Sequence, residues 1–144
     1  MKAKQIVDIL LEGGDDLDII KNGTRRQKME LLLRNNSTDV FKIASRDKDP
    51  LIRWCVCGVP NLSVEMINFL AKSPDSLVRY YVLRRKGTIP VTILNILKND
   101  VDSRVRRFAN LRLSGASQKQ LEIEGQHDEI KLDMAALRQS GGHN

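Results

Sequence analysis

The sequence predicts an all-α protein, a right-handed α-solenoid of stacked short helical hairpins. Three observations favour this fold class. A motif that reads Asp-x-x-(Ile/Val)-Arg recurs with a spacing of 26 and then 27 residues, and such a period is typical of repeat proteins. Apolar residues ahead of each copy follow the spacing of one helix face. The chain is 41% hydrophobic but only 4% aromatic, which suits the packing of helix on helix.

Each copy of the motif predicts the second helix of a hairpin. Every copy starts with an aspartate, which caps free N–H groups when it precedes a helix, and Pro50 suits the first helical position. The capping aspartates are Asp49, Asp75 and Asp102. We therefore expect the second helices over about 50–58, 76–85 and 103–112.

An apolar pattern ahead of each motif predicts the first helix of the hairpin. Apolar residues at i, i+1, i+3 and i+4 form one helical stripe. They are Val40, Phe41, Ile43 and Ala44, then Met66, Ile67, Phe69 and Leu70, then Ile93, Leu94, Ile96 and Leu97. We expect these helices over about 38–46, 64–72 and 91–98, with Pro60 and Pro90 in or beside the links between hairpins, where a helix cannot continue.

The predicted solenoid covers residues 1–114. An amphipathic helix at 2–12 caps its N-terminus, a degenerate hairpin follows at 15–35, and the repeats occupy 38–112. Within the degenerate hairpin, Thr24 and Gln27 fit a capping box. Because neighbouring hairpins cover each other's apolar sides, they must stack to form a core. Residues 115–144 form an acidic C-terminal tail that we expect to be partly helical or flexible.

The repeat resembles the variant leucine-rich repeat, a short relative of the HEAT repeat. The resemblance covers about 38–112 and is carried by residues 47–53, Val56, residues 59–63, Ile67 and Leu70. It implies a HEAT-like α-solenoid and is nearly silent on function. Some members of that family carry a cysteine-ligated iron–sulfur cluster ahead of the repeats, but residues 1–37 contain no cysteine. We expect no cofactor.

The opening residues 1–13 resemble the start of many bacteriophage proteins. This resemblance implies a phage accessory or inhibitor protein. No apolar run approaches the roughly 20 residues that span a bilayer, and Asp8 interrupts the one stretch that is similar to a signal peptide. We therefore expect a cytoplasmic protein that does not enter a membrane.

The motif arginines predict a ladder along one face of the repeats. Its members are Arg53, Arg79 and Arg106, with Arg26 ahead of them. Each guanidinium could bond an aspartate of its own or a neighbouring repeat, or the ladder could form a stripe that binds phosphates or acidic side chains. The residues that follow are Trp54, Tyr80 and Arg107. They could fill the seam between repeats or serve as exposed interface anchors.

Positive charge is concentrated in residues 79–112. This segment has nine basic and two acidic residues, a net charge of +7, within a chain whose net charge is +6. The basic residues include Arg84, Arg85, Lys86, Arg104, Arg106 and Arg107. They could form a solvated helical face, or they could attract nucleic acid or an acidic protein. The acidic tail could fold back and mask this patch, cap the repeats, or bind a partner.

We find no catalytic constellation and expect no enzyme activity. Both histidines, His127 and His143, lie in the tail, so no Ser or Cys of the repeats has a nearby His partner. Cys55 and Cys57 point to different faces of a helix and suit neither a disulfide nor a zinc site. We interpret them as a buried structural pair. HEAT-like DNA glycosylases provide an enzymatic precedent for the architecture, but this chain is short for that fold and has a single Trp.

The leading functional hypothesis is a non-enzymatic protein–protein interaction module that uses the second-helix face of the repeats. The expected partner is a protein with an acidic surface. The candidate partner-binding residues are Arg53, Trp54, Arg79, Tyr80, Arg84, Arg85, Lys86, Arg104, Arg106 and Arg107. The alternative is sequence-independent nucleic-acid binding through residues 79–112. A third hypothesis is an assembly role in which subunits exchange the tail.

Overall fold

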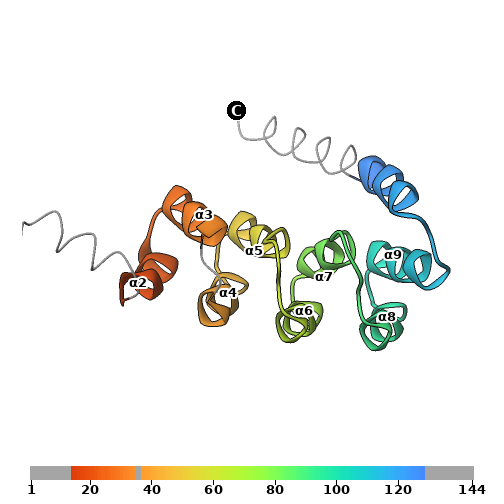
Figure 1. Cartoon of the computed structure of the whole chain (residues 1–144), viewed down its shortest axis with the longest axis horizontal. Helices are drawn as coiled ribbons and strands as arrows, with labels where there is room; N and C mark the ends of the chain where they lie inside the picture. Colours follow the sequence, from red (N-terminus) through yellow and green to blue (C-terminus); the bar gives the residue numbers. More distant parts are fainter. Residues whose placement is uncertain (1–13, 35–36, 129–144) are drawn as a thin grey trace, which may run out of the picture. The chain divides into compact units, whose positions relative to one another are not determined.

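The computed structural model describes residues 14–34 and 37–128, and all regular secondary structure in these residues is helical (Figure 1). The predicted all-α class is therefore confirmed. The chain divides into two compact units, residues 1–85 and residues 86–144. The capping helix predicted at 2–12 and the last part of the predicted tail lie outside the described residues.

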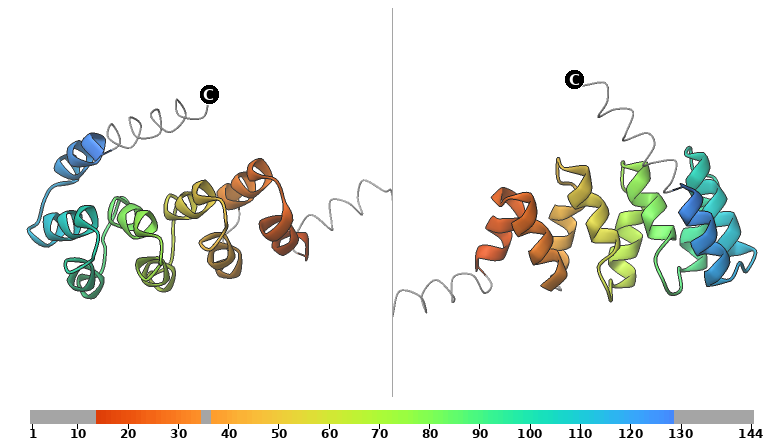
Figure 2. Two further views of the ribbon diagram at one scale, coloured as in Figure 1. Left: turned by 180° about the vertical axis from the view of Figure 1, so that it is seen from behind. Right: turned by 90° about the horizontal axis from the view of Figure 1, so that it is seen from above.

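The first unit is a series of three helical hairpins. They are α2 (Gly14–Asn22) with α3 (Arg25–Arg34), α4 (Thr38–Ala44) with α5 (Pro50–Cys57), and α6 (Val64–Ala71) with α7 (Ser76–Leu83). The first helices contact one another in the order α2, α4, α6, and the second helices in the order α3, α5, α7. Figures 1 and 2 show the two resulting rows of helices in this unit.

The second unit contains a further hairpin and a third helical segment. The hairpin is α8 (Val91–Leu97) with α9 (Ser103–Leu113). Residues 118–128 are also helical and lie on the side of α9 opposite α8 (Figures 1 and 2). The predicted tail thus includes a helix that packs within this unit.

Aspartate caps determine where the second helices begin, as predicted. Asp49, Asp75 and Asp102 are the N-cap residues of α5, α7 and α9, and each carboxylate accepts a hydrogen bond from a backbone N–H of the first helical turn. The predicted capping box is also present, because Gln27 N donates to Thr24 Oγ1 and Thr24 N donates to Gln27 Oε1.

The apolar pattern of the first helices is buried at three of its four positions. The buried residues are Val40, Phe41 and Ala44 in α4, Met66, Ile67 and Leu70 in α6, and Ile93, Leu94 and Leu97 in α8. The prediction was wrong at the third position of the stripe, where Ile43 and Phe69 are half-buried and Ile96 is 61% exposed. This position lies at the edge of the helix face, so its side chain remains on the surface.

Candidate functional site

Arg53 on α5 connects its hairpin to the next one. Its Nε donates to Oδ2 of Asp75 over 2.8 Å, and its Nη1 donates to the carbonyl oxygen of Asp47 over 2.6 Å. Partial burial raises the pKa of Asp75, but hydrogen bonds from Arg53 and Trp54 outweigh burial and hold that pKa below its usual value. Arg53 therefore holds both its own hairpin and the cap of α7.

The bond to a carbonyl recurs at the same place in the other repeats. Arg79 Nη1 donates to the carbonyl oxygen of Ser73 over 2.6 Å, and Arg106 Nη1 donates to that of Asp100 over 2.7 Å. In every case the acceptor lies six residues before the arginine, in the turn between the two helices of the hairpin. The motif arginine thus fixes its own hairpin turn, and this leaves it fewer N–H donors for a partner.

The N-terminal end of the predicted ladder needs correction. Arg26 is not its first member, because its side chain is 89% exposed and pairs with Glu30 on the same helix. Its neighbour Arg25 pairs with Asp49 over 2.6 Å instead, and this hydrogen bond lowers the pKa of the Asp49 carboxyl. Lys28 also bonds the next hairpin, through a largely buried ion pair with Asp47.

The aromatic residues beside the ladder differ in accessibility. Tyr80 is 0% exposed, so it does not lie on a partner-binding surface. Trp54 is half-buried, its Nε1 donates to Oδ2 of Asp75 over 3.0 Å, and its ring lies 6.0 Å from that of Tyr81. Trp54 therefore helps to join two hairpins of the first unit.

Arg84, Arg85 and Lys86 form one predicted basic segment but have different surroundings. Arg85 Nη1 donates to the carbonyl oxygens of Cys57 and Val59 at the end of α5, and burial lowers the pKa of this guanidinium. The Arg84 guanidinium lies over the buried ring of Tyr80, 5.7 Å from its centroid. Lys86 is exposed. All three residues carry a positive charge, but only the Lys86 side chain is exposed, whereas Arg84 and Arg85 are half-buried.

The arginines of α9 also bond within their own unit. Arg104 pairs with the N-cap carboxylate of Asp102 over 3.2 Å. Arg107 pairs with Glu124 and with Asp128, both in the helical segment 118–128. Like Arg106, these two residues of the predicted basic patch donate guanidinium N–H groups to acceptors within their own unit.

An apolar pocket of about 270 Å³ lies on the second-helix side of the first unit. Met29, Leu32 and Leu33 of α3 line it together with Cys55, Gly58 and Val59. Leu33 is 79% exposed at this surface. Among residues 14–34 and 37–128, no charged residue lines the pocket, so these residues supply no group that would select an acidic partner.

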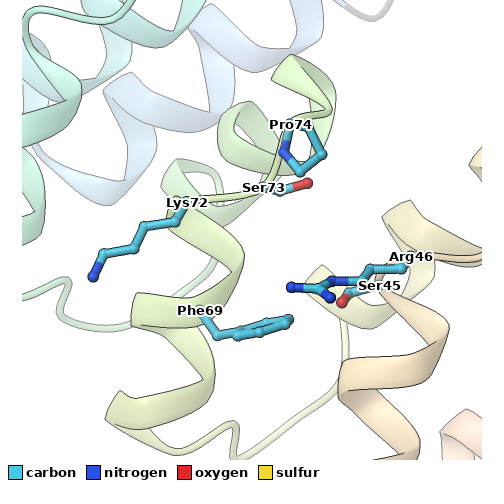
Figure 3. Close-up of a pocket in the computed structure, with 6 residues that line it drawn as sticks. All are labelled: Ser45, Arg46, Phe69, Lys72, Ser73 and Pro74. Atoms are coloured by element: carbon cyan, nitrogen blue, oxygen red, sulfur yellow. The ribbon is translucent and has the colours of Figure 1, made fainter.

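A second pocket, with a different chemistry, lies between the second and third hairpins of the first unit. It has a volume of about 210 Å³ and lies between the α4–α5 turn and the α6–α7 turn. The residues that line it are Ser45, Arg46, Phe69, Lys72, Ser73 and Pro74 (Figure 3). We call this the turn pocket. None of these residues is among the binding residues that we predicted from the sequence.

Arg46 and Phe69 face each other across the turn pocket. The guanidinium carbon of Arg46 lies 5.1 Å from the Phe69 ring centroid, and the ring is half-buried while Arg46 is exposed (Figure 3). Lys72 extends from the rim away from Arg46. In the part of the chain that the structure describes, the side chains of Arg46 and Lys72 form no ion pair.

The sequence contains a pattern that could have indicated the turn pocket. It begins at the third position of the apolar stripe, the position that is not fully buried. Phe69 is followed three residues later by Lys72, Ile43 is followed at the same spacing by Arg46, and Ile96 is followed two residues later by Lys98. In these three hairpins, an apolar residue near the end of the first helix is therefore followed by a cation within three residues. We missed the signal because we assigned this apolar residue to the core.

The two cysteines of α5 differ in burial. Cys57 is buried as predicted, with burial raising its thiol pKa to about 12, whereas Cys55 is only half-buried. Among residues 14–34 and 37–128, no group of three His, Cys, Asp or Glu residues could hold a metal ion. Nor is any helix in these ranges both long and apolar enough to cross a membrane.

Comparisons with known proteins leave the chain's own geometry as the basis for assigning a function. No protein-family model, curated protein or solved structure matches the sequence or the fold.

Proposed function

We propose that the chain is a non-enzymatic interaction module, an α-solenoid of HEAT-like hairpins that binds an acidic partner protein at the turn pocket. The observation that carries this proposal is the Arg46 side chain. It is exposed, lies on the Phe69 ring and borders a pocket of about 210 Å³, and it has no ion pair among the described residues.

The solenoid part of the proposal is supported by repetition inside the hairpins. The first helices of the first unit contact each other in order, and so do the second helices. The aspartate cap and the arginine–carbonyl bond recur at equivalent places in α5, α7 and α9. A repeat architecture of this kind presents an extended surface, which suits binding to another macromolecule.

The chemistry of the turn pocket favours a carboxylate flanked by apolar groups. A guanidinium that lies on an aromatic ring keeps the N–H groups at its edge, and these can form two parallel bonds to one carboxylate. Phe69 supplies an apolar wall, and Lys72 adds a second positive charge at the rim. A protein segment with acidic and apolar side chains offers both kinds of contact.

Nucleic-acid binding through residues 79–112 has less support, because several arginines of that segment donate to internal acceptors. Arg85 and Arg106 bond backbone carbonyls, and Arg107 bonds two carboxylates. Binding to a phosphate backbone requires several cations that can release counterions together. The turn pocket offers one arginine with an aromatic ring, which fits a single acidic side chain better.

A direct test is fluorescence anisotropy with a labelled peptide of alternating glutamate and leucine, titrated with the full chain at low salt. We expect saturable binding that Arg46→Gln weakens by about 10- to 100-fold, since a charge-assisted hydrogen bond contributes on the order of 1.5–3 kcal/mol. Phe69→Ala should also weaken it. Arg26→Gln is the matched control, because it removes an exposed cation of the same unit far along the chain from the pocket.

The outcomes separate the competing functions. Failure to bind the acidic peptide, or equal losses from Arg46→Gln and Arg26→Gln, would refute the proposal. Labelled single-stranded DNA should bind more weakly than the peptide. Tighter DNA binding with a steep dependence on salt concentration would instead establish a nucleic-acid surface.

A further inference from the structure

Arg107 of α9 forms ion pairs with two residues of the helical segment 118–128. Arg107 Nη1 donates to Glu124 Oε2 over 2.8 Å, and Arg107 Nη2 donates to Asp128 Oδ2 over 2.5 Å. The two carboxylates are four residues apart, so they lie on the same face of their helix. Arg107 is partly exposed, whereas Asp128 is only 3% exposed. One guanidinium therefore forms ion pairs with two carboxylates of the same helix.

The apolar attachment of this segment is small. Leu121 is its only large apolar residue that is buried within 118–128, while Ile123 is 46% exposed. The first helix of the same unit, α8, buries Ile93, Leu94 and Leu97. Within residues 118–128, one buried leucine and two ion pairs that are partly exposed attach the segment to α9, and salt weakens such ion pairs.

The position of Arg107 in the repeat has the same function in another hairpin. Trp54 is the equivalent residue of α5, since each follows the motif arginine directly. Trp54 Nε1 donates to the carboxylate of Asp75, which belongs to the following hairpin. In both places a donor at this position of the second helix binds a carboxylate of the next helical element.

We propose that the side of α9 around Arg107 is a docking surface for an acidic helix of a partner protein, and that residues 118–128 occupy it as an internal substitute. The required ligand is a helix with a leucine followed by carboxylates three and seven residues later, the pattern of Leu121, Glu124 and Asp128. The partner helix replaces the internal one on Arg107. This surface involves none of the residues of the turn pocket, so each proposal can fail without the other.

The test uses the full chain with the double substitution Glu124→Gln and Asp128→Asn, which keeps the shape of segment 118–128 but removes its charges. The probe is a labelled synthetic peptide with the sequence of residues 117–128, which retains the cap in which Gln120 N donates to Ser117 Oγ. Fluorescence anisotropy gives the affinity for the peptide. Hydrogen exchange of residues 118–128 reports whether the internal helix has opened.

We expect the double variant to bind the peptide about tenfold more tightly than the wild type, because the docking surface is accessible in a larger fraction of molecules. Adding Arg107→Gln should abolish this binding while exchange of 118–128 stays fast. Glu122→Gln is the control, since Glu122 is exposed on the same helix and forms no ion pair among the described residues. It should leave the affinity for the peptide at the wild-type value.

Three results would overturn the proposal. Slow exchange of 118–128 in the double variant would show that the two ion pairs do not hold the helix. An open helix without any gain in peptide affinity would show that the surface does not accept an acidic helix in trans. A wild-type mass of two chains by light scattering, reduced to one by the peptide, would make a second copy of this chain the occupant.

Discussion

Arg46 and Arg53 belong to the same hairpin but have opposite surroundings. Arg53 bonds the carboxylate that caps α7 and a carbonyl of its own turn. Arg46 lies on an aromatic ring beside the turn pocket and forms no ion pair with a described residue. The arginine that recurs with the repeat thus stabilises the hairpins, whereas the arginine outside the motif is available to a ligand.

We expect the largest loss of stability from removing the Asp75 carboxylate, which accepts hydrogen bonds from two residues of the preceding hairpin. Asp75→Ala removes the cap of α7 and the acceptor for both Arg53 and Trp54. We expect the free energy of unfolding to fall by about 2–3 kcal/mol, from the lost cap and from donors left without an acceptor. Urea denaturation measures the change. Asp39→Ala, in the first turn of α4, is the control and should change it by less than about 0.5 kcal/mol.

Arg85 and Lys86 provide a second comparison between neighbouring cations. Arg85→Met should destabilise the chain by about 1–2 kcal/mol, because the carbonyls of Cys57 and Val59 lose their donor. Lys86→Met should have almost no effect, since Lys86 is exposed. Thermal unfolding followed by circular dichroism is sufficient to compare them. Equal losses would contradict the structural role of Arg85.

The sequence was sufficient to predict the helices but not the roles of their charges. The apolar spacing and the caps at Asp49, Asp75 and Asp102 depend on contacts within one hairpin, so they can be recognised from local sequence. The partners of Arg53 and Arg107 are distant in the sequence. Arg53 bonds a carboxylate that lies 22 positions later in the chain, and Arg107 bonds one that lies 21 positions later. Such contacts are set by packing, and one sequence does not specify them.

A smaller effect is expected from pH. The pKa of the Asp75 carboxyl is lower in the folded chain than its usual value. A carboxyl of this kind contributes stability above its unfolded pKa of about 3.9, and this contribution is lost as the pH falls through the folded pKa. Urea midpoints near pH 7 and about pH 3 should therefore differ less in Asp75→Asn than in the wild type. An unchanged difference would mean that Asp75 contributes nothing to the acid sensitivity.

The smallest effect concerns the two thiols of α5, which distinguish the buried side of the helix from its more accessible side. Burial raises the pKa of Cys57 to about 12 and also raises that of Cys55, which is less buried. Because the thiolate is the nucleophile, iodoacetamide at mildly alkaline pH should modify Cys55 well before Cys57. Mass spectrometry of the digested protein gives both rates. Equal rates of modification at Cys55 and Cys57 in the native chain would contradict this burial pattern.

The most direct test of the central claim compares Arg46→Gln with Arg53→Gln in two measurements on each variant. These are the affinity for the labelled glutamate–leucine peptide and the urea midpoint of unfolding. We predict that Arg46→Gln loses affinity and keeps the wild-type midpoint, whereas Arg53→Gln unfolds at lower urea and, while folded, keeps the wild-type affinity. The reverse pattern, with Arg53 required for binding and Arg46 for stability, would contradict the account.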